Sequence, residues 1–214
     1  MTGQPELDEA LRTRLAALCA EGWAIFERFD AEVRNRTFHP FVAADYEVVQ
    51  AALVAHRGDR LRFLEWGSAS GVIAIMADLL GYDACGIELD ASLVSTARAL
   101  AARFDSHARF VAGSFLPTGY AWKSGDGDTR TVTIGRGSSG YLQLGHALDD
   151  FDVVFGYPWD GEEPILHDVM RRYGGGNALL LVHGVETGVK AYRGGREVTA
   201  DLSAQRQGQT PLPR

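Results

Sequence analysis

The strongest constraint on the fold is the order of local patterns over residues 61–90. Residues 61–66 form an apolar run with aromatic side chains, which favours a short buried strand. A glycine- and serine-rich turn follows at residues 67–71. Apolar residues then recur at helical spacing over residues 72–80, and a second short strand is expected at residues 84–87. This order predicts one half of a parallel α/β sheet.

Each part of this arrangement has a chemical use. Glycines allow a sharp turn and let a ligand approach the backbone closely. The free N–H groups at the start of the helix favour an electron-rich ligand group. Glu88, which ends the second predicted strand, is placed to accept two hydrogen bonds from ribose hydroxyls. The stretch therefore predicts a nucleoside-binding half-fold.

The glycine spacing separates two cofactor classes. A dinucleotide site requires glycine at the first, third and sixth positions of its turn. Counting from Gly67, the third position is Ala69 and the sixth is Val72, so only the first matches. The chain has Glu65-x-Gly67-x-x-x-Gly71 instead, with an acidic residue before the first glycine. A nicotinamide-dependent oxidoreductase is disfavoured but stays open, as does a plain Rossmann-type turn whose glycines serve only close packing.

The Glu65-to-Gly71 pattern resembles motif I of the class I S-adenosylmethionine-dependent methyltransferases, where glycine usually stands in place of Ala69. The resemblance covers residues 63–186. It implies a Rossmann-like α/β fold with a doubly wound, mostly parallel sheet. It also implies methyl transfer from S-adenosylmethionine, with S-adenosylhomocysteine as the product. The cofactor-binding residues it assigns are Glu65, Gly67, Ser68, Ala69, Gly71, Glu88, Leu89, Ser114, Phe115 and Tyr46.

Two parts of the chain depart from the family pattern. The family often has an aspartate that contacts adenine where this chain has Ser114. The turn Gly156-Tyr157-Pro158-Trp159 stands at the position of motif IV, beside the transferable methyl group. It is similar to the Asn/Asp-Pro-Pro-aromatic motif of amino-group methyltransferases, but a tyrosine replaces the amide or acid and one proline is missing. A fold-only relative that binds a partner without catalysis is therefore also an alternative.

The resemblance implies an acceptor site around that turn. An aromatic ring there can contact a cationic or planar group, and the acids Asp160, Glu162 and Glu163 offer carboxylates at the rim. Packing of Trp159 and capping of the next helix by these acids is the structural alternative. A histidine follows the fifth strand, where open α/β sheets place ligands. The expected catalytic residues are Tyr157, Trp159, Asp160 and His183.

Residues 1–58 are expected to form an N-terminal helical cap. Apolar spacing predicts a helix over residues 2–35, which Gly22 could interrupt, and which could cover the sheet, close the pocket or pair two copies in a homodimer. Asp45 is the expected N-cap of a helix over residues 46–56. The family resemblance makes His39, Phe41 and Tyr46 candidate pocket residues, although a structural role for the histidine is the simpler reading.

The rest of the core is assigned to residues 59–200. Residues 116–150 form an insertion, expected to contain a β-hairpin around residues 131–134. A last hairpin is expected over residues 189–198, turning at two glycines. Residues 201–214 are polar and contain proline, which is typical of a disordered tail.

Composition limits the partners. The 214 residues carry a formal net charge of −7, which argues against a chain whose main task is to grip nucleic acid and favours a small molecule or a protein as acceptor. The two cysteines, Cys19 and Cys85, lie in apolar segments without metal-ligand spacing. Neither a signal peptide nor a membrane span is recognised, so a cytoplasmic protein is expected.

Overall fold

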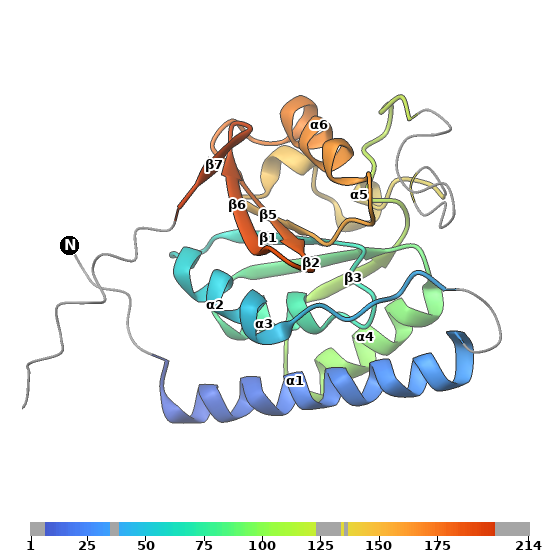
Figure 1. Ribbon diagram of the computed structural model, residues 1–214, viewed down its shortest axis with the longest axis vertical. Helices are drawn as coiled ribbons and strands as arrows, with labels where there is room; N and C mark the ends of the chain where they lie inside the picture. The colour runs from blue at the N-terminus through green and yellow to red at the C-terminus, as the bar shows by residue number, and fades with distance from the viewer. Residues whose placement is uncertain (1–6, 35–38, 123–133, 135–136, 200–214) are drawn as a thin grey trace, which may run out of the picture.

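The structure is a computed structural model that describes residues 7–34, 39–122, 134 and 137–199 (Figure 1). The helices are α1 (Glu9–Phe29), α2 (Tyr46–His56), α3 (Val72–Leu79), α4 (Ala91–Arg103), α5 (Tyr141–Leu144) and α6 (Glu163–Tyr173), with a π-helical turn at Asp30–Arg34 and a 3-10 turn at Leu148–Asp150. The strands are β1 (Arg62–Trp66), β2 (Asp83–Glu88), β3 (Arg109–Ala112), β4 (Val153–Gly156), β5 (Leu179–Gly184), β6 (Gly188–Arg193) and β7 (Arg196–Val198).

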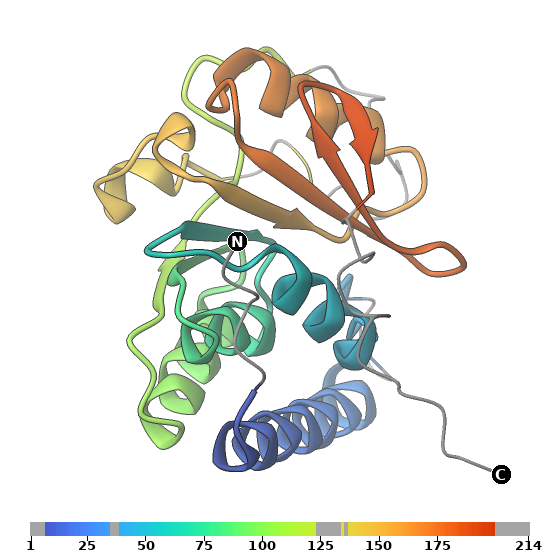
Figure 2. The same ribbon diagram turned by 90° about the vertical axis from the view of Figure 1, so that its left-hand side faces the viewer.

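The seven strands form one sheet in the order β3-β2-β1-β4-β5-β6-β7. The first five are parallel to their neighbours, whereas β6 is antiparallel to β5 and β7 is antiparallel to β6. Helices cover both faces of the sheet (Figure 2). The predicted Rossmann-like, mostly parallel, doubly wound sheet is confirmed.

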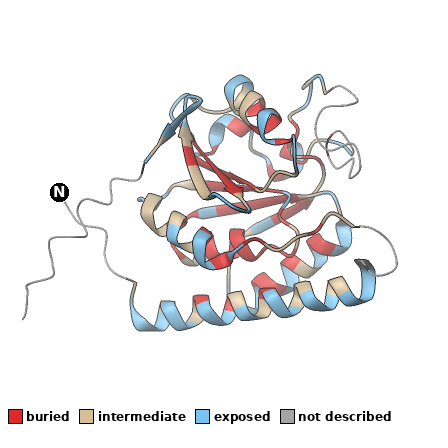
Figure 3. Cartoon of the chain, in the orientation of Figure 1, coloured by how far each residue is buried: buried red, intermediate tan, exposed pale blue. Residues whose placement is uncertain are grey.

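The sheet separates two hydrophobic cores. Side chains alternate between the faces of a strand, so Phe63 joins the core under α2, α3 and α4, while Leu64 joins the core under α5 and α6. Helix α3 is buried over its first six residues, because α1 covers the side that faces away from the sheet (Figure 3). A helix that is apolar all round requires such cover. The molecule therefore has an extra helical layer on the α3 side.

Helix α1 begins after Asp8, whose carboxylate accepts the N–H of Leu11 at 2.7 Å. Of the two possibilities left open at Gly22, the continuous helix is the one observed, because α1 runs through this residue without a break. A Cβ at this position would lie 2.7 Å from Val72 Cγ2 and 2.9 Å from a ring carbon of Tyr46. The glycine thus allows α1 to approach α3 and α2 closely. Pairing of two copies through this helix stays a prediction.

The last three strands form a meander. β6 and β7 turn at Gly194-Gly195, whose φ angles of 57° and 75° suit a two-residue hairpin turn. This hairpin is confirmed. The hairpin expected around residues 131–134 and the tail expected over residues 201–214 fall almost wholly outside the described residues.

Two further findings concern the chain as a whole. None of the helices in the described ranges is long and apolar enough to cross a membrane. Both cysteines are free, and burial raises the pKa of Cys19 and of Cys85 to about 11. Such thiols are largely protonated at neutral pH and behave as small apolar side chains.

Candidate functional site

The turn from β1 to α3 is tightly bent. Gly67, Ala69 and Gly71 all have positive φ, at 65°, 44° and 79°. The N–H of Ser68 donates to the carbonyl of Ile87 at 3.0 Å, which ties the turn to β2. The turn therefore lies at the carboxyl ends of β1 and β2, where open parallel sheets bind ligands.

The two glycines of this turn have different surroundings. A Cβ on Gly71 would lie 2.7 Å from Ala97 Cβ and 2.7 Å from the ring of Phe110, so this glycine serves close packing on α4 and β3. A Cβ on Gly67 would meet nothing within 4 Å. Close packing thus explains Gly71 but leaves Gly67 free to face a ligand.

Glu65 places a carboxylate in the interior. Glu65 is 4% exposed, and its Oε2 accepts the backbone N–H of Ala74, in the first turn of α3, at 2.9 Å. Burial raises the pKa of Glu65 well above its ordinary value, and the charge of Glu88 adds to this, against the opposing hydrogen bond from Ala74. A carboxylate held in this way is suited to a cationic ligand group.

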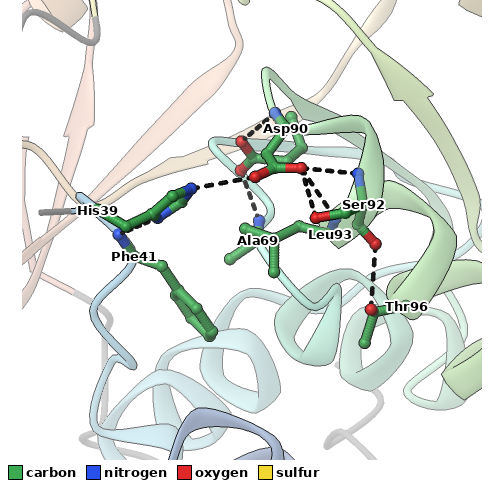
Figure 4. A network of polar contacts seen from close by, with 8 residues as sticks. His39, Phe41, Ala69, Asp90, Ser92, Leu93 and Thr96 are labelled. Atoms are coloured by element: carbon green, nitrogen blue, oxygen red, sulfur yellow. Dashed lines mark hydrogen bonds and ion pairs between the residues drawn. The ribbon is translucent and has the colours of Figure 1, made fainter. Parts of the chain in front are cut away.

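Glu88 ends β2 beside the turn. Its Oε2 accepts the N–H of Ala69 at 2.8 Å, and its Oε1 accepts the N–H of Asp90 at 2.9 Å; Figure 4 shows both donor residues. Burial raises its pKa, opposed by these backbone hydrogen bonds. Two oxygens offer about four acceptor positions, and the backbone N–H groups of Ala69, Leu89 and Asp90 take three of them, which leaves one for a ribose hydroxyl.

A pocket opens at the carboxyl ends of β1 and β4. The structure brings together there seven of the predicted site and pocket residues, from three separate segments of the chain. The pocket is lined by residues 41–44, Tyr46, residues 65–70, Val72, Ile73, Phe155 and Tyr157. Tyr46 is 3% exposed, and burial together with the Glu65 carboxylate raises its pKa. His39 does not line this pocket.

Three of the predicted cofactor-binding residues, Leu89, Ser114 and Phe115, do not line this pocket. Leu89 is exposed, and the ring of Phe115 stacks on Trp66 at 5.1 Å between centroids. Ser114 is buried, and its hydroxyl accepts the N–H of Leu116 at 3.1 Å. Its backbone forms a parallel bridge with residues 138–140. The polar groups of Ser114 are thus already engaged within the chain.

Tyr157 and His183 meet at the acceptor side, where β4 and β5 end. Their rings lie 4.5 Å apart at 70°. His183 is 4% exposed, and its Nδ1 has no hydrogen-bond partner among the described residues. Burial lowers the pKa of His183, against the opposing charge of Asp45, so the ring is neutral at pH 7. A neutral imidazole can accept a proton.

Of the four predicted catalytic residues, only Tyr157 lines the pocket, while His183, Trp159 and Asp160 lie outside its lining. Asp160 is exposed, as expected for the rim. Trp159 is half-buried, and its backbone N–H donates to Glu162 Oε2 at 3.0 Å. Of the two alternatives for Glu162, burial favours the structural one, because this residue is 5% exposed at the N-cap position of α6. Its carboxylate accepts a backbone N–H of the turn that precedes the helix.

Sequence reasoning missed several pocket residues. Phe155 lies opposite Glu65 because β4 pairs in parallel with β1, and Trp66 closes the end of β1. It also missed the contact of His39 Nε2 with Asp90 Oδ2 at 3.1 Å. An apolar residue in a predicted strand carries no local signal of its strand neighbour, so only the sheet order could have found Phe155.

The chain matches no protein-family model, and no curated protein sequence matches it. Among solved structures it resembles an RNA methyltransferase from Salinibacter ruber in complex with S-adenosyl-L-homocysteine, at 18% identity over 66% of this chain and 76% of that one, with a TM-score of 0.49. It also resembles a precorrin-6y C5,15-methyltransferase from Geobacter metallireducens, at 18% identity over 69% and 70%, with a TM-score of 0.45. A TehB-like SAM-dependent methyltransferase from Corynebacterium glutamicum gives 20% identity over 78% and 74%, with a TM-score of 0.41.

At these identities the likeness is one of fold. A shared α/β fold hosts many unrelated activities, so the chemistry has to come from the residues of the site. Those residues are a buried carboxylate at a helix start, an open glycine beside it and a second carboxylate at the end of β2. Together with the sheet order, they form a candidate ligand site at the carboxyl ends of β1 and β2 of a Rossmann-like fold.

Proposed function

We propose that the chain is a methyltransferase that uses S-adenosylmethionine. The observation that carries this proposal is the Glu65 carboxylate, which lies buried in the pocket beside the open side of Gly67. A buried carboxylate is costly unless it meets a cation. The methionine part of the cofactor carries an ammonium group, which meets this requirement.

The other residues of the site fit the same ligand. Glu88 lies one strand away from Glu65, where it would hold the ribose. Ser68 Oγ is buried without a hydrogen-bond partner in the part of the chain that is described, which offers one more polar contact. The bound cofactor supplies a methyl group already activated on a sulfonium, so the protein has mainly to position the acceptor.

The same carboxylate argues against a dinucleotide. In a dinucleotide site the pyrophosphate binds at the helix start, where free N–H groups favour an anion. Here Glu65 already places a carboxylate there, on the N–H of Ala74. A pyrophosphate would have to compete with this side chain for the helix start. Val72, where a third glycine would be required, is instead a buried valine.

For the acceptor we favour a small molecule or a protein. The net charge of −7 disfavours a polyanion, and the pocket is lined by aromatic rings such as those of Phe155 and Tyr157. Tyr157 would contact the acceptor. His183, which is neutral, would take a proton from an acceptor that has to lose one.

Calorimetric titration tests the cofactor. We expect S-adenosylmethionine and S-adenosylhomocysteine to bind with micromolar affinity and NAD not to bind. Glu88→Ala should weaken binding by about 100-fold, since it removes a hydrogen bond from a ribose hydroxyl to a charged group. Glu88→Gln keeps one acceptor oxygen and should retain part of the affinity. Glu197→Ala, an exposed acid on β7, is the control.

Binding of NAD with no affinity for the other two ligands would replace this proposal with an oxidoreductase. Tight binding of S-adenosylhomocysteine without methyl transfer to any acceptor tried would favour the non-catalytic relative. Loss of nucleoside affinity in the Glu197→Ala control would mean that the effect of Glu88→Ala is not specific.

A further inference from the structure

His39 joins two parts of the molecule that are far apart in the sequence (Figure 4). The N–H of Phe41 donates to His39 Nδ1 at 3.1 Å, so this nitrogen carries no hydrogen. The hydrogen of the neutral ring is therefore on Nε2, which lies 3.1 Å from Asp90 Oδ2. One neutral tautomer satisfies both contacts.

Asp90 is a fixed anchor for this contact. Its Oδ1 caps α4 by accepting the N–H of Ser92 at 2.7 Å and the hydroxyl of the same residue at 2.6 Å. Its own N–H donates to Glu88 Oε1 at 2.9 Å. A continuous path of hydrogen bonds thus runs from the backbone of Phe41, through His39 and Asp90, to the carboxylate proposed to hold the ribose.

The other end of the path is a wall of the pocket. Residues 39–44, here called the strap, connect the end of the α1 region to α2, and residues 41–44 line the pocket. The ring of Phe41 is 6% exposed and lies 5.4 Å from that of Phe26 and 5.2 Å from that of Phe29. Phe29 also contacts the ring of His39 at 4.8 Å. The strap is thus held by aromatic contacts to α1 and by one polar contact to Asp90.

The geometry points to His39 as a positioning residue that fastens the strap to the nucleoside end of the site and so slows release of the bound cofactor. This inference rests on the proposed function, because the ligand that the strap retains is the one proposed there. The side chains of His39 and Asp90 are only 21% and 31% exposed, so water competes weakly for their hydrogen bond. Loss of the imidazole removes the polar contact of the strap with Asp90, and it removes no group of the pocket lining.

Stopped-flow binding of S-adenosylhomocysteine tests this inference, with tryptophan fluorescence as the signal because Trp66 lines the pocket. His39→Ala should raise the dissociation rate constant by about tenfold. His39→Gln, whose amide can both accept from Phe41 and donate to Asp90, should stay within about threefold of the wild-type rate. His167→Ala is the matched control, since that histidine also contacts an acid, Glu163, at 3.4 Å, but lies on α6.

Hydrogen exchange of the Phe41 amide gives a second readout that does not depend on the variant binding ligand. Saturating S-adenosylhomocysteine should slow this exchange in the wild type, and His39→Ala should speed it in the free protein. Two results would overturn the inference and leave the proposed function intact. One is an unchanged dissociation rate constant in a stably folded His39→Ala, and the other is an exchange rate of the wild-type Phe41 amide that the ligand does not alter. No binding by the wild type would instead be a failure of the proposed function.

Discussion

Glu65→Gln is expected to weaken binding of S-adenosylhomocysteine by at least about 100-fold, because removing one partner of a buried ion pair costs about 3 kcal/mol or more. The amide keeps an acceptor oxygen for the N–H of Ala74, which now bonds the carboxylate at 2.9 Å. The N–H of Ala74 at the start of α3 therefore keeps its hydrogen bond. Calorimetry on the variant beside the wild type measures the change.

The same substitution should make the protein more stable above neutral pH. Burial raises the pKa of Glu65 in the folded chain well above that in the unfolded chain. Stability from this group is therefore complete below the unfolded pKa and is lost as pH rises through the folded pKa. Glutamine does not ionise and escapes that loss. Thermal unfolding at pH 5 and at pH 8 should show a larger gain for the variant at pH 8.

Glu163→Gln is the control for both measurements, because it removes an exposed acid from the first turn of α6. If Glu65→Gln bound the ligand as the wild type does, the buried carboxylate could not be the partner of the ammonium group. A variant that is less stable at pH 8 would instead show that the carboxylate serves the packing of the core.

Gly71→Ala is expected to destabilise the fold by about 3 kcal/mol, which adds the cost of a left-handed backbone to that of overpacking. Its φ is 79°, and the new methyl carbon would lie 2.7 Å from Ala97 Cβ and from the ring of Phe110. For a chain of this length the melting temperature should fall by about 10 °C. Differential scanning calorimetry measures this fall.

Gly67→Ala should weaken ligand binding more than it weakens the fold, unlike Gly71→Ala. Its φ of 65° costs about 1–2 kcal/mol, but no atom lies within 4 Å of the new Cβ, so the fold should survive while the nucleoside ligand loses its close approach. Gly145→Ala is the matched control, because Gly145 has a φ of 71° and equally open surroundings. It lies away from the candidate site, since its neighbour His146 contacts Arg109 at the amino end of β3. Equal ligand affinity in the Gly67 and Gly145 variants would contradict the assignment of Gly67 to the site.

Much of the fold is predictable because short-range chemistry decides it. The caps at Asp45 and Asp90 were expected from the residue type and position, and both side chains accept N–H groups of the helices that follow them. The expected helix over residues 72–80 corresponds to α3. Apolar spacing, glycine turns and caps each act within a few residues, so the sequence displays them directly.

The cofactor half of the candidate site is likewise decided by residues that are close in the sequence. Glu65, the glycine turn and Glu88 belong to one strand-helix-strand unit, whose geometry is set by the local chain. The structure accordingly places both carboxylates against backbone N–H groups of that unit, those of Ala74 and Ala69. Position 114 was the exception, since the bridge from Ser114 to residue 139 involves an insertion whose path has no local rule.

The acceptor side and the strap were decided by the tertiary structure alone. Phe155 lies beside Glu65, and Tyr157 beside His183, only because β4 inserts between β1 and β5. His39 meets Asp90 across 51 residues of sequence. By itself the sequence determined the main helices and strands and the strand-helix-strand unit that carries Glu65 and Glu88, because neighbouring residues dictate these. Which distant side chains share a pocket depends on strand order and register, and no single segment of the chain encodes them.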